Sequence, residues 1–141
     1  MVTLLGGLGS GLVATIVMTV VMMLLGDDSP PPTAVFWAKY VGDGGPAASM
    51  IPGMGLHLLY GTGAGGVFAL IATTAGLGVD TLGGALGWAL AFAAALTLFG
   101  MVFWMRIVLA MEPEPKAAAM FGLLHAVYGV VLAVGLLFVP F

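Results

Sequence analysis

The chain has 141 residues, of which 62% are hydrophobic and only 6% are charged, and its net charge is −3. This composition is typical of an integral membrane protein, and a total of three cations argues against nucleic acid as a partner. The sequence contains no cysteine, which excludes disulfides, iron–sulfur clusters and thiol catalysis.

Four hydrophobic runs follow one another along the chain, at about residues 4–25, 52–75, 82–109 and 117–138. A helix needs roughly 20 apolar residues to cross a hydrocarbon core about 30 Å thick, and lipid tolerates no open sheet edge. The sequence therefore predicts an all-α fold of four transmembrane helices. They form a single membrane domain over residues 1–141, with the lipid bilayer as its surroundings.

The only sizeable connection covers residues 26–50, between the first two runs. It begins with DDSPPP, continues with the amphipathic stretch TAVFWAKYV at 33–41, and ends with the turn-forming sequence GDGGP. Trp37 and Tyr40 are typical of the membrane–water interface, so we expect a short interfacial helix over 33–41. A surface loop with two aromatic anchors is the alternative interpretation.

The third run is longer than the hydrocarbon core is thick. Its helix should therefore tilt, bend near Gly100, or carry the Arg106 guanidinium out to the lipid headgroups.

The cations indicate the orientation of the chain in the cell membrane. Lys39, Arg106 and Lys116 all lie in or beside the first and third connections. The positive-inside rule therefore places those two connections in the cytoplasm and both termini outside. Most acidic residues, Asp27 and Asp28 among them, share the cytoplasmic side, but acidic residues contribute little to this rule.

An internal repeat links the second and fourth runs. HLLYG at 57–61 recurs as HAVYG at 125–129, and each copy follows an acidic, proline-rich connection. This pattern predicts two helical hairpins in tandem, related by an axis along the membrane normal, so that the second and fourth helices run parallel. His57 and His125, the only histidines of the sequence, should then lie at similar depths and can meet.

Each histidine is followed by tyrosine at i+3 and glycine at i+4, namely Tyr60 and Gly61 in one copy and Tyr128 and Gly129 in the other. Residues at these spacings lie on one stripe of a helix. A further small residue follows four positions later in both copies, which gives a surface that lets helices approach closely. The same surface would leave room for a flat ring beside an imidazole.

Two interpretations of the histidine pair follow. In the first, His57 and His125 hold a b-type haem, and Arg106 and Lys116 meet its propionates, because imidazole is a good iron ligand and such haems occur inside helical bundles. In the second, each imidazole is neutral and bonded to a neighbouring helix. Interhelical bonds of this kind are worth roughly 0.6 kcal/mol on average, which is enough to specify packing.

Proton transfer and metal transport are further alternatives. A proton relay usually has a carboxylate at mid-membrane, whereas every Asp and Glu here lies near the end of a hydrophobic run. Three MxxxM pairs, beginning at Met18, Met50 and Met101, place thioethers on common helical faces, and thioethers suit Cu(I). Methionine is also a routine filler of apolar gaps.

Glycine supplies 23 of the 141 residues. Glycines four positions apart in apolar helices mark close helix contacts. We therefore expect contact faces at Gly7 and Gly11 on the first helix and at Gly83 and Gly87 on the third.

The sequence offers no evidence for catalysis. It has no HExxH motif and no serine close to a histidine in sequence. With a histidine in the second span followed by a glycine-rich run, it resembles small four-span membrane proteins of prokaryotes. Its scarcity of lysine, with DDSPPP and EPEP, is similar to the composition of proteins from halophilic archaea. This resemblance implies membership of a membrane class without an assigned activity.

We expect a small, non-catalytic membrane subunit that contacts other subunits, or copies of itself, in a respiratory or other electron-transfer assembly. One alternative is a stand-alone b-type cytochrome with a single haem between the second and fourth helices, exchanging electrons with quinone. Another is a small transporter or metal-ion permease.

Overall fold

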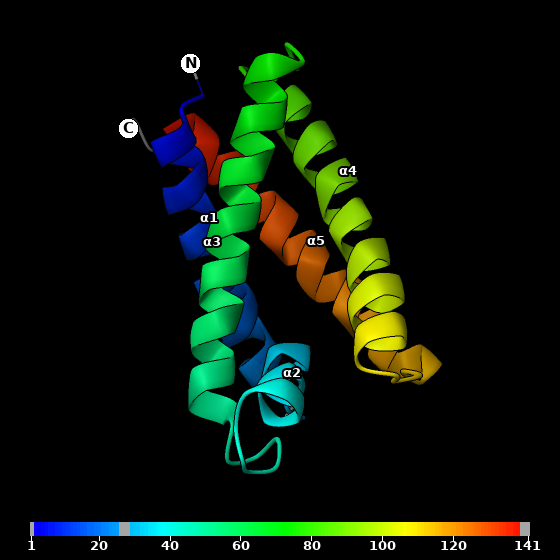
Figure 1. Cartoon of the computed structure of the whole chain (residues 1–141). Coiled ribbons are helices and arrows are strands. Elements are labelled where there is room, and N and C mark those ends of the chain that lie inside the picture. Colours follow the sequence, from blue (N-terminus) through cyan, green and yellow to red (C-terminus); the bar gives the residue numbers. More distant parts are fainter. Residues whose placement is uncertain (1, 26–28, 139–141) are drawn as a thin grey trace.

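The computed structural model describes residues 2–25 and 29–138, so Asp27 and Asp28 of the orientation argument lie outside the described residues. Within these ranges the chain is helical and contains no strand. The elements are α1 (Leu4–Leu24), α2 (Pro32–Tyr40), α3 (Met50–Thr74), α4 (Leu82–Phe99), the π-helix η1 (Gly100–Val108) and α5 (Pro115–Phe138) (Figure 1). Among the described residues, four helical stretches are long and apolar enough to cross a membrane, with α4 and η1 forming one of them, so four long apolar helices form where the sequence predicted them.

The helix ends follow local rules. Thr3 and Thr81 precede α1 and α4, and their hydroxyl oxygens accept hydrogen bonds from the backbone N–H groups of Gly6 and Gly84, at 3.0 and 3.2 Å. Such caps satisfy donors that have no partner within the helix. The α5 helix starts with Pro115, because a residue without an N–H costs least in the first turn.

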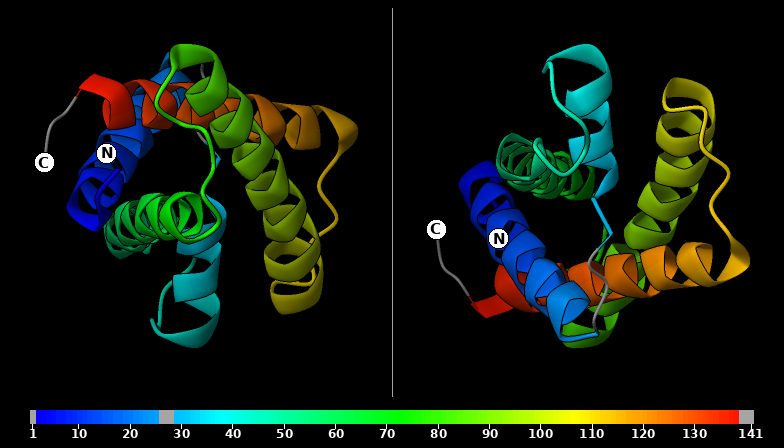
Figure 2. Two further views of the ribbon diagram at one scale, coloured as in Figure 1. Left: turned by 90° about the horizontal axis from the view of Figure 1, so that it is seen from above. Right: turned by 90° about the horizontal axis from the view of Figure 1, so that it is seen from below.

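The α1 helix is central to the packing: it contacts both α3 and α5, while α4 packs on α5 and α2 packs on α3. The consecutive helices α3 and α4 are joined by a short connection at one end and diverge toward the other (Figure 1). Views along the bundle show α3 and α4 on separate sides, with α5 running obliquely past α1 (Figure 2). The splayed ends of α3 and α4 leave space that other side chains line.

Glycine brings the α1 and α3 backbones into direct contact. A Cβ atom added at Gly11 would lie 2.7 Å from the Gly61 carbonyl oxygen and 2.9 Å from Gly65 Cα. At Gly61 an added Cβ would overlap the side chain of Thr15. The predicted contact face at Gly7 and Gly11 is therefore confirmed, and its partner is the glycine-rich part of α3. Gly83 and Gly87, in contrast, have no atom within 4 Å of an added Cβ and face outward.

The short helix α2 forms where the sequence predicted a helix over 33–41. It packs on α3 at Gly53, where an added Cβ would lie 2.7 Å from the Ala34 backbone nitrogen. At its other end, the Lys39 Nζ and the Tyr40 hydroxyl both donate to the Val108 carbonyl oxygen, at 3.2 and 2.7 Å. This carbonyl lies at the end of η1, where helical carbonyls lack intrahelical partners. The α2 helix thereby connects α3 to η1.

At Gly100 the third span changes from an α-helix to the π-helix η1. A bend near this residue was one of three alternatives that the sequence left open for the long third run, and the π-helix was not predicted. An added Cβ at Gly100 would lie 2.7 Å from Phe121 Cζ, so the glycine lets an α5 ring pack against the junction. The segment ends near Ala110, which has a φ of +53°, a left-handed conformation that side-chain-bearing residues rarely adopt.

The two ends of the helical bundle are formed by different segments of the chain. The start of α1, the end of α5 and the α3–α4 connection lie at one end, while α2 and the η1–α5 connection lie at the other (Figure 1). The helices α3 and α5 both run from the second end toward the first. Consequently the two HxxYG motifs enter the bundle from the same end, in the same direction.

Candidate functional site

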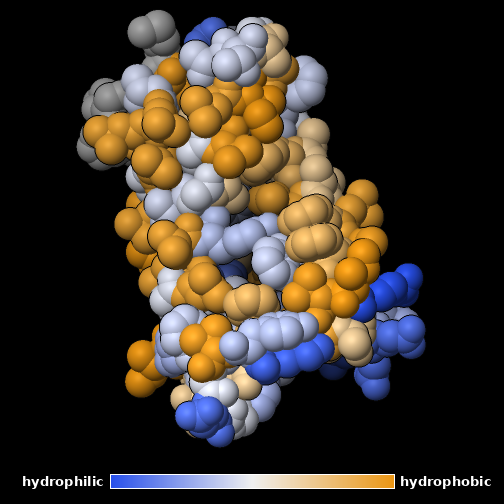
Figure 3. All heavy atoms as spheres, viewed as in Figure 1, coloured by the Kyte–Doolittle hydropathy of each residue, from blue (hydrophilic) through white to orange (hydrophobic). Residues whose placement is uncertain are grey.

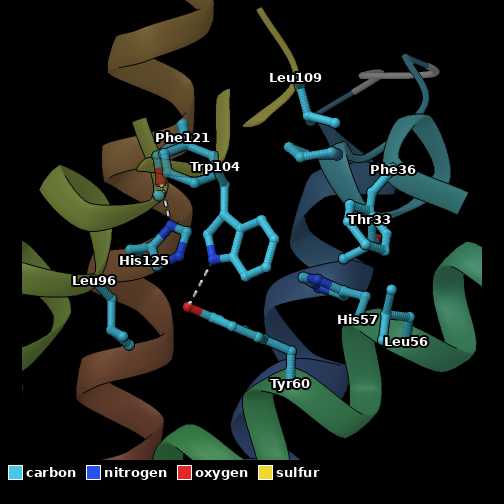
Figure 4. A pocket seen from close by; sticks show the side chains of 12 residues that line it. Thr33, Phe36, Leu56, His57, Tyr60, Leu96, Trp104, Leu109, Phe121 and His125 are labelled. Atoms are coloured by element: carbon cyan, nitrogen blue, oxygen red, sulfur yellow. Dashed lines mark hydrogen bonds between the residues drawn. The ribbon is translucent and has the colours of Figure 1, made fainter. Parts of the chain in front are cut away.

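A cavity of about 280 Å³ lies in the space between the splayed helices. Both histidines line it, and almost all of its remaining surface is apolar (Figure 4). The lining residues come from every helix except α1: Pro32, Thr33, Phe36, Leu56, His57, Tyr60, Leu96, Gly100, Trp104, Leu109, Phe121 and His125. None of them is acidic or permanently charged.

The His57 side chain projects from α3 into the cavity, beside Leu56 and opposite α5 (Figure 4). No hydrogen bond from the described residues to either of its ring nitrogens is present. A polar group in apolar surroundings normally has a partner, because leaving it without one costs free energy. The His57 imidazole is therefore available to bond to a molecule in the cavity.

The His125 side chain enters from α5, on the other side of the cavity (Figure 4). Its Nδ1 lies 2.8 Å from the Phe121 carbonyl oxygen, one turn earlier in the helix, and the two rings are 4.3 Å apart between centroids. A carbonyl oxygen can only accept, so Nδ1 carries the proton. In a neutral imidazole Nε2 is then an unprotonated acceptor.

Aromatic side chains from three elements form the middle of the cavity. The Trp104 indole of η1 meets the Phe36 ring of α2 edge to face at 5.7 Å and the Tyr60 ring of α3 at 6.2 Å. The Trp104 Nε1–H group donates to the Tyr60 hydroxyl oxygen at 3.4 Å. This hydrogen bond joins α3 to η1 across the gap that separates them (Figure 4).

One further polar atom of the lining has no partner. The Thr33 hydroxyl oxygen is buried without a hydrogen bond, as is that of Ser10; these are the two such side-chain atoms in the described part of the chain. Thr33 lies in the first turn of α2, next to Phe36 (Figure 4). An unsatisfied buried hydroxyl in a cavity is a ready donor or acceptor for a bound molecule.

The two copies of the repeat, HLLYG and HAVYG, are in direct contact, but their two tyrosines lie in different surroundings. Tyr128 is 2% exposed and its hydroxyl donates to the Gly61 carbonyl oxygen at 2.7 Å, a bond between α5 and α3. Tyr60 is 39% exposed and lines the cavity. Gly129 lies against α4, where an added Cβ would be 3.0 Å from the Ala89 carbonyl oxygen. Both motif glycines therefore provide space for a neighbouring helix, and neither lines the cavity.

The two cations considered for haem propionates lie outside the cavity. Arg106 in η1 and Lys116 at the start of α5 are both exposed, and neither belongs to the lining. Within residues 2–25 and 29–138, no group of three or more histidine, aspartate or glutamate side chains is placed to hold a metal ion.

Sequence reasoning identified both histidines and Tyr60 but missed the aromatic residues that complete the cavity. Trp104 is one of three tryptophans in the chain. It lies four residues after Gly100, and no other feature of the sequence distinguishes it from the other two tryptophans. Phe121 lies four residues before His125, a spacing at which helical side chains are neighbours, and that spacing could have identified it.

Comparison of the chain with protein-family models, curated proteins and solved structures finds no match.

Proposed function

We propose that this chain is a small, non-catalytic membrane protein that holds a lipid-soluble ring molecule in the cavity between α3, η1 and α5. The observation that carries the proposal is the presence in one apolar cavity of two imidazoles, each with at least one ring nitrogen that has no hydrogen bond to the described residues. Ligand sites are typically apolar hollows with a few convergent polar groups, and ionisable residues inside membranes mark functional sites.

The volume of the cavity matches a ligand with a single ring. An engineered apolar cavity of about 150 Å³ binds benzene, so a cavity of about 280 Å³ can accommodate a single substituted ring. On the face of the molecule seen in Figure 1, a recess exposes less hydrophobic residues among strongly hydrophobic ones (Figure 3). A ligand dissolved in the bilayer can enter from such an opening.

A co-purification experiment tests this proposal. The wild-type protein and a variant with both His57→Leu and His125→Leu are purified identically in a mild detergent, and their organic extracts are compared by mass spectrometry. The proposal predicts a ring compound that is enriched in the wild-type extract and depleted in that of the variant. Identical extracts from two well-folded proteins would contradict it.

A b-type cytochrome is the second candidate, because the His125 Nδ1–H bond to a backbone carbonyl leaves Nε2 free to act as a metal ligand. A haem is much larger than a single ring, so this function requires the α3–α4 gap to widen. A reduced-minus-oxidised visible spectrum of protein supplied with haem separates the candidates. Sharp b-type bands that disappear with His57→Ala or His125→Ala would favour the cytochrome, and a flat spectrum would favour the ring ligand.

We further infer that the protein works as a subunit of a larger membrane assembly, with other subunits or copies of itself as partners. The support is the outward face of α4, where Gly83 and Gly87 leave open space beside the 46% exposed side chain of Trp88. Small residues permit close helix approach in lipid. Gly87→Leu should release the partner or dissociate the oligomer in size-exclusion chromatography with light scattering, whereas Leu70→Ala on α3 should not.

The orientation and the interfacial position of α2 belong to the same proposal. We infer that α2 lies at the cytoplasmic surface and that both termini lie outside. We also infer that the two helical hairpins arose by tandem duplication. The chain contains no cysteine, so single cysteines report sidedness directly. An impermeant maleimide added outside intact cells should label Gly78→Cys and leave Lys39→Cys unlabelled; the reverse result would invert the orientation.

A further inference from the structure

The hydrogen-bonding groups of the cavity indicate whether its ligand carries hydrogen-bond donors or only acceptors. At His125 the proton is on Nδ1, because the Phe121 carbonyl oxygen at 2.8 Å can only accept. The cavity lining contains no carboxylate that would stabilise an imidazolium. His125 therefore presents a lone pair on Nε2, and this position calls for a hydrogen-bond donor on the ligand.

The other polar atoms of the cavity can adapt to a hydroxyl group. His57 has no partner among the described residues, so its ring can offer either a lone pair or an N–H group. The Thr33 hydroxyl can rotate to donate or accept. Tyr60 already accepts from the Trp104 N–H group, which leaves its own O–H group free to donate. A ligand hydroxyl can thus donate to an imidazole and accept from a protein hydroxyl.

The shape of the cavity favours an aromatic ring between the imidazoles. His57 and His125 approach from opposite sides, and the side chains of Trp104 and Phe36 provide aromatic faces and edges (Figure 4). Aromatic rings gain from stacked and edge-to-face contacts in addition to the burial of their surface. A ring with a polar group at each end matches this arrangement.

We propose that the ligand is a hydroquinone, a benzene ring with hydroxyl groups at opposite ends, and that the cavity prefers it to the corresponding quinone. This inference rests on the proposed function and names its ligand class. One hydroxyl donates to His125 Nε2 and the other donates to His57. A quinone has only acceptor oxygens, so its carbonyl would place a lone pair against the lone pair of His125 Nε2, and that contact is repulsive.

Binding measurements on the full chain in lipid nanodiscs test this preference. Calorimetric titrations without oxygen compare an alkyl hydroquinone, its dimethyl ether and the corresponding quinone, with protein-free nanodiscs as the blank. We expect the hydroquinone to bind about tenfold more tightly than either analogue, because one net hydrogen bond of up to about 1.5 kcal/mol corresponds to roughly that factor. The analogue series uses the wild-type chain, so it does not depend on a variant that folds.

Variants then assign the preference to His125. His125→Leu should remove the tenfold preference, and His125→Gln should restore part of it, because a glutamine carbonyl can accept near the position of Nε2. Leu123→Ala, at a 52% exposed position on the same helix, is the matched control and should retain the preference.

The outcomes separate this inference from the proposed function. Preference for the hydroquinone in the wild type, lost in His125→Leu, supports both. Equal binding of all three compounds would leave a ring-binding cavity but overturn the hydroquinone preference. If none of the compounds produces heat above the blank, both the inference and the proposed function fail.

Discussion

Replacing Gly65 with alanine tests the packing that positions the cavity, because α3 is held against α1 by this glycine. An added Cβ would lie 2.7 Å from Gly11 Cα and 2.9 Å from the Gly11 backbone nitrogen. Carbon atoms at their optimum are about 3.5 to 4.0 Å apart, so the two helices would have to separate by roughly 1 Å. The contacting atoms belong to the backbone and cannot rotate away.

The expected size of the effect follows from two opposing terms. Overpacking of this kind costs about 1–3 kcal/mol, while alanine is intrinsically better than glycine in a helix by up to about 1 kcal/mol. Gly65→Ala should therefore lower the free energy of unfolding by about 1–2 kcal/mol. Gly63→Ala is the matched control on the same helix, since an added Cβ there meets no atom within 4 Å. The control should leave stability unchanged or raise it slightly.

Reversible unfolding in mixed micelles, followed by circular dichroism as the denaturing detergent is increased, measures both variants on one scale. Equal stability of Gly65→Ala and Gly63→Ala would mean that the α1 and α3 backbones are not in contact at this point.

Three further substitutions test other parts of the structure. Ala110→Gly should raise the free energy of unfolding by about 1 kcal/mol in the same assay, because glycine adopts a positive φ without the steric cost that alanine bears; a loss of stability would contradict the left-handed conformation. Tyr128→Phe removes the bond to the Gly61 carbonyl and should cost about 0.6–2 kcal/mol, and an unchanged midpoint would argue against that bond. Gly100→Ala should displace the Phe121 ring and weaken hydroquinone binding severalfold while the chain still folds; unchanged affinity would remove Phe121 from the site.

The four long apolar helices could be predicted from the sequence because their signal is local. Long apolar runs interrupted by Pro, Gly and acidic residues fix where helices end, and the observed α1 (Leu4–Leu24) differs from the predicted span 4–25 by a single residue. The second span begins at Met50 instead of residue 52, since Pro52 is tolerated within the first turn.

The face of each helix that turns inward could not be predicted in the same way. These helices are apolar on most sides, so no amphipathic stripe distinguishes an outward-facing leucine from one that lines the cavity. The π-helix begins at Gly100, where Phe121 packs closely, and that contact joins segments that are separated along the sequence. The bond between Tyr60 and Trp104 likewise exists only once α3 and η1 have been brought together.

The repeat shows what local similarity can and cannot predict. HLLYG and HAVYG predicted that the two histidines can meet, and both of them line one cavity. They did not indicate that Tyr128 would bond to the first copy while Tyr60 faced the cavity, because that difference is set by which helix each copy packs against. The glycines next to those tyrosines allow helix contact in both copies.

Photolabelling is the measurement that tests most directly whether a ring ligand occupies the cavity. A hydroquinone carrying a small photoreactive group is irradiated with the protein in nanodiscs, and the modified residues are identified by mass spectrometry. Our account predicts labels on cavity residues such as Tyr60, Leu96 and Trp104, suppressed by excess unmodified hydroquinone. Labels confined to outward residues such as Val67 and Leu70, and unaffected by the competitor, would contradict it.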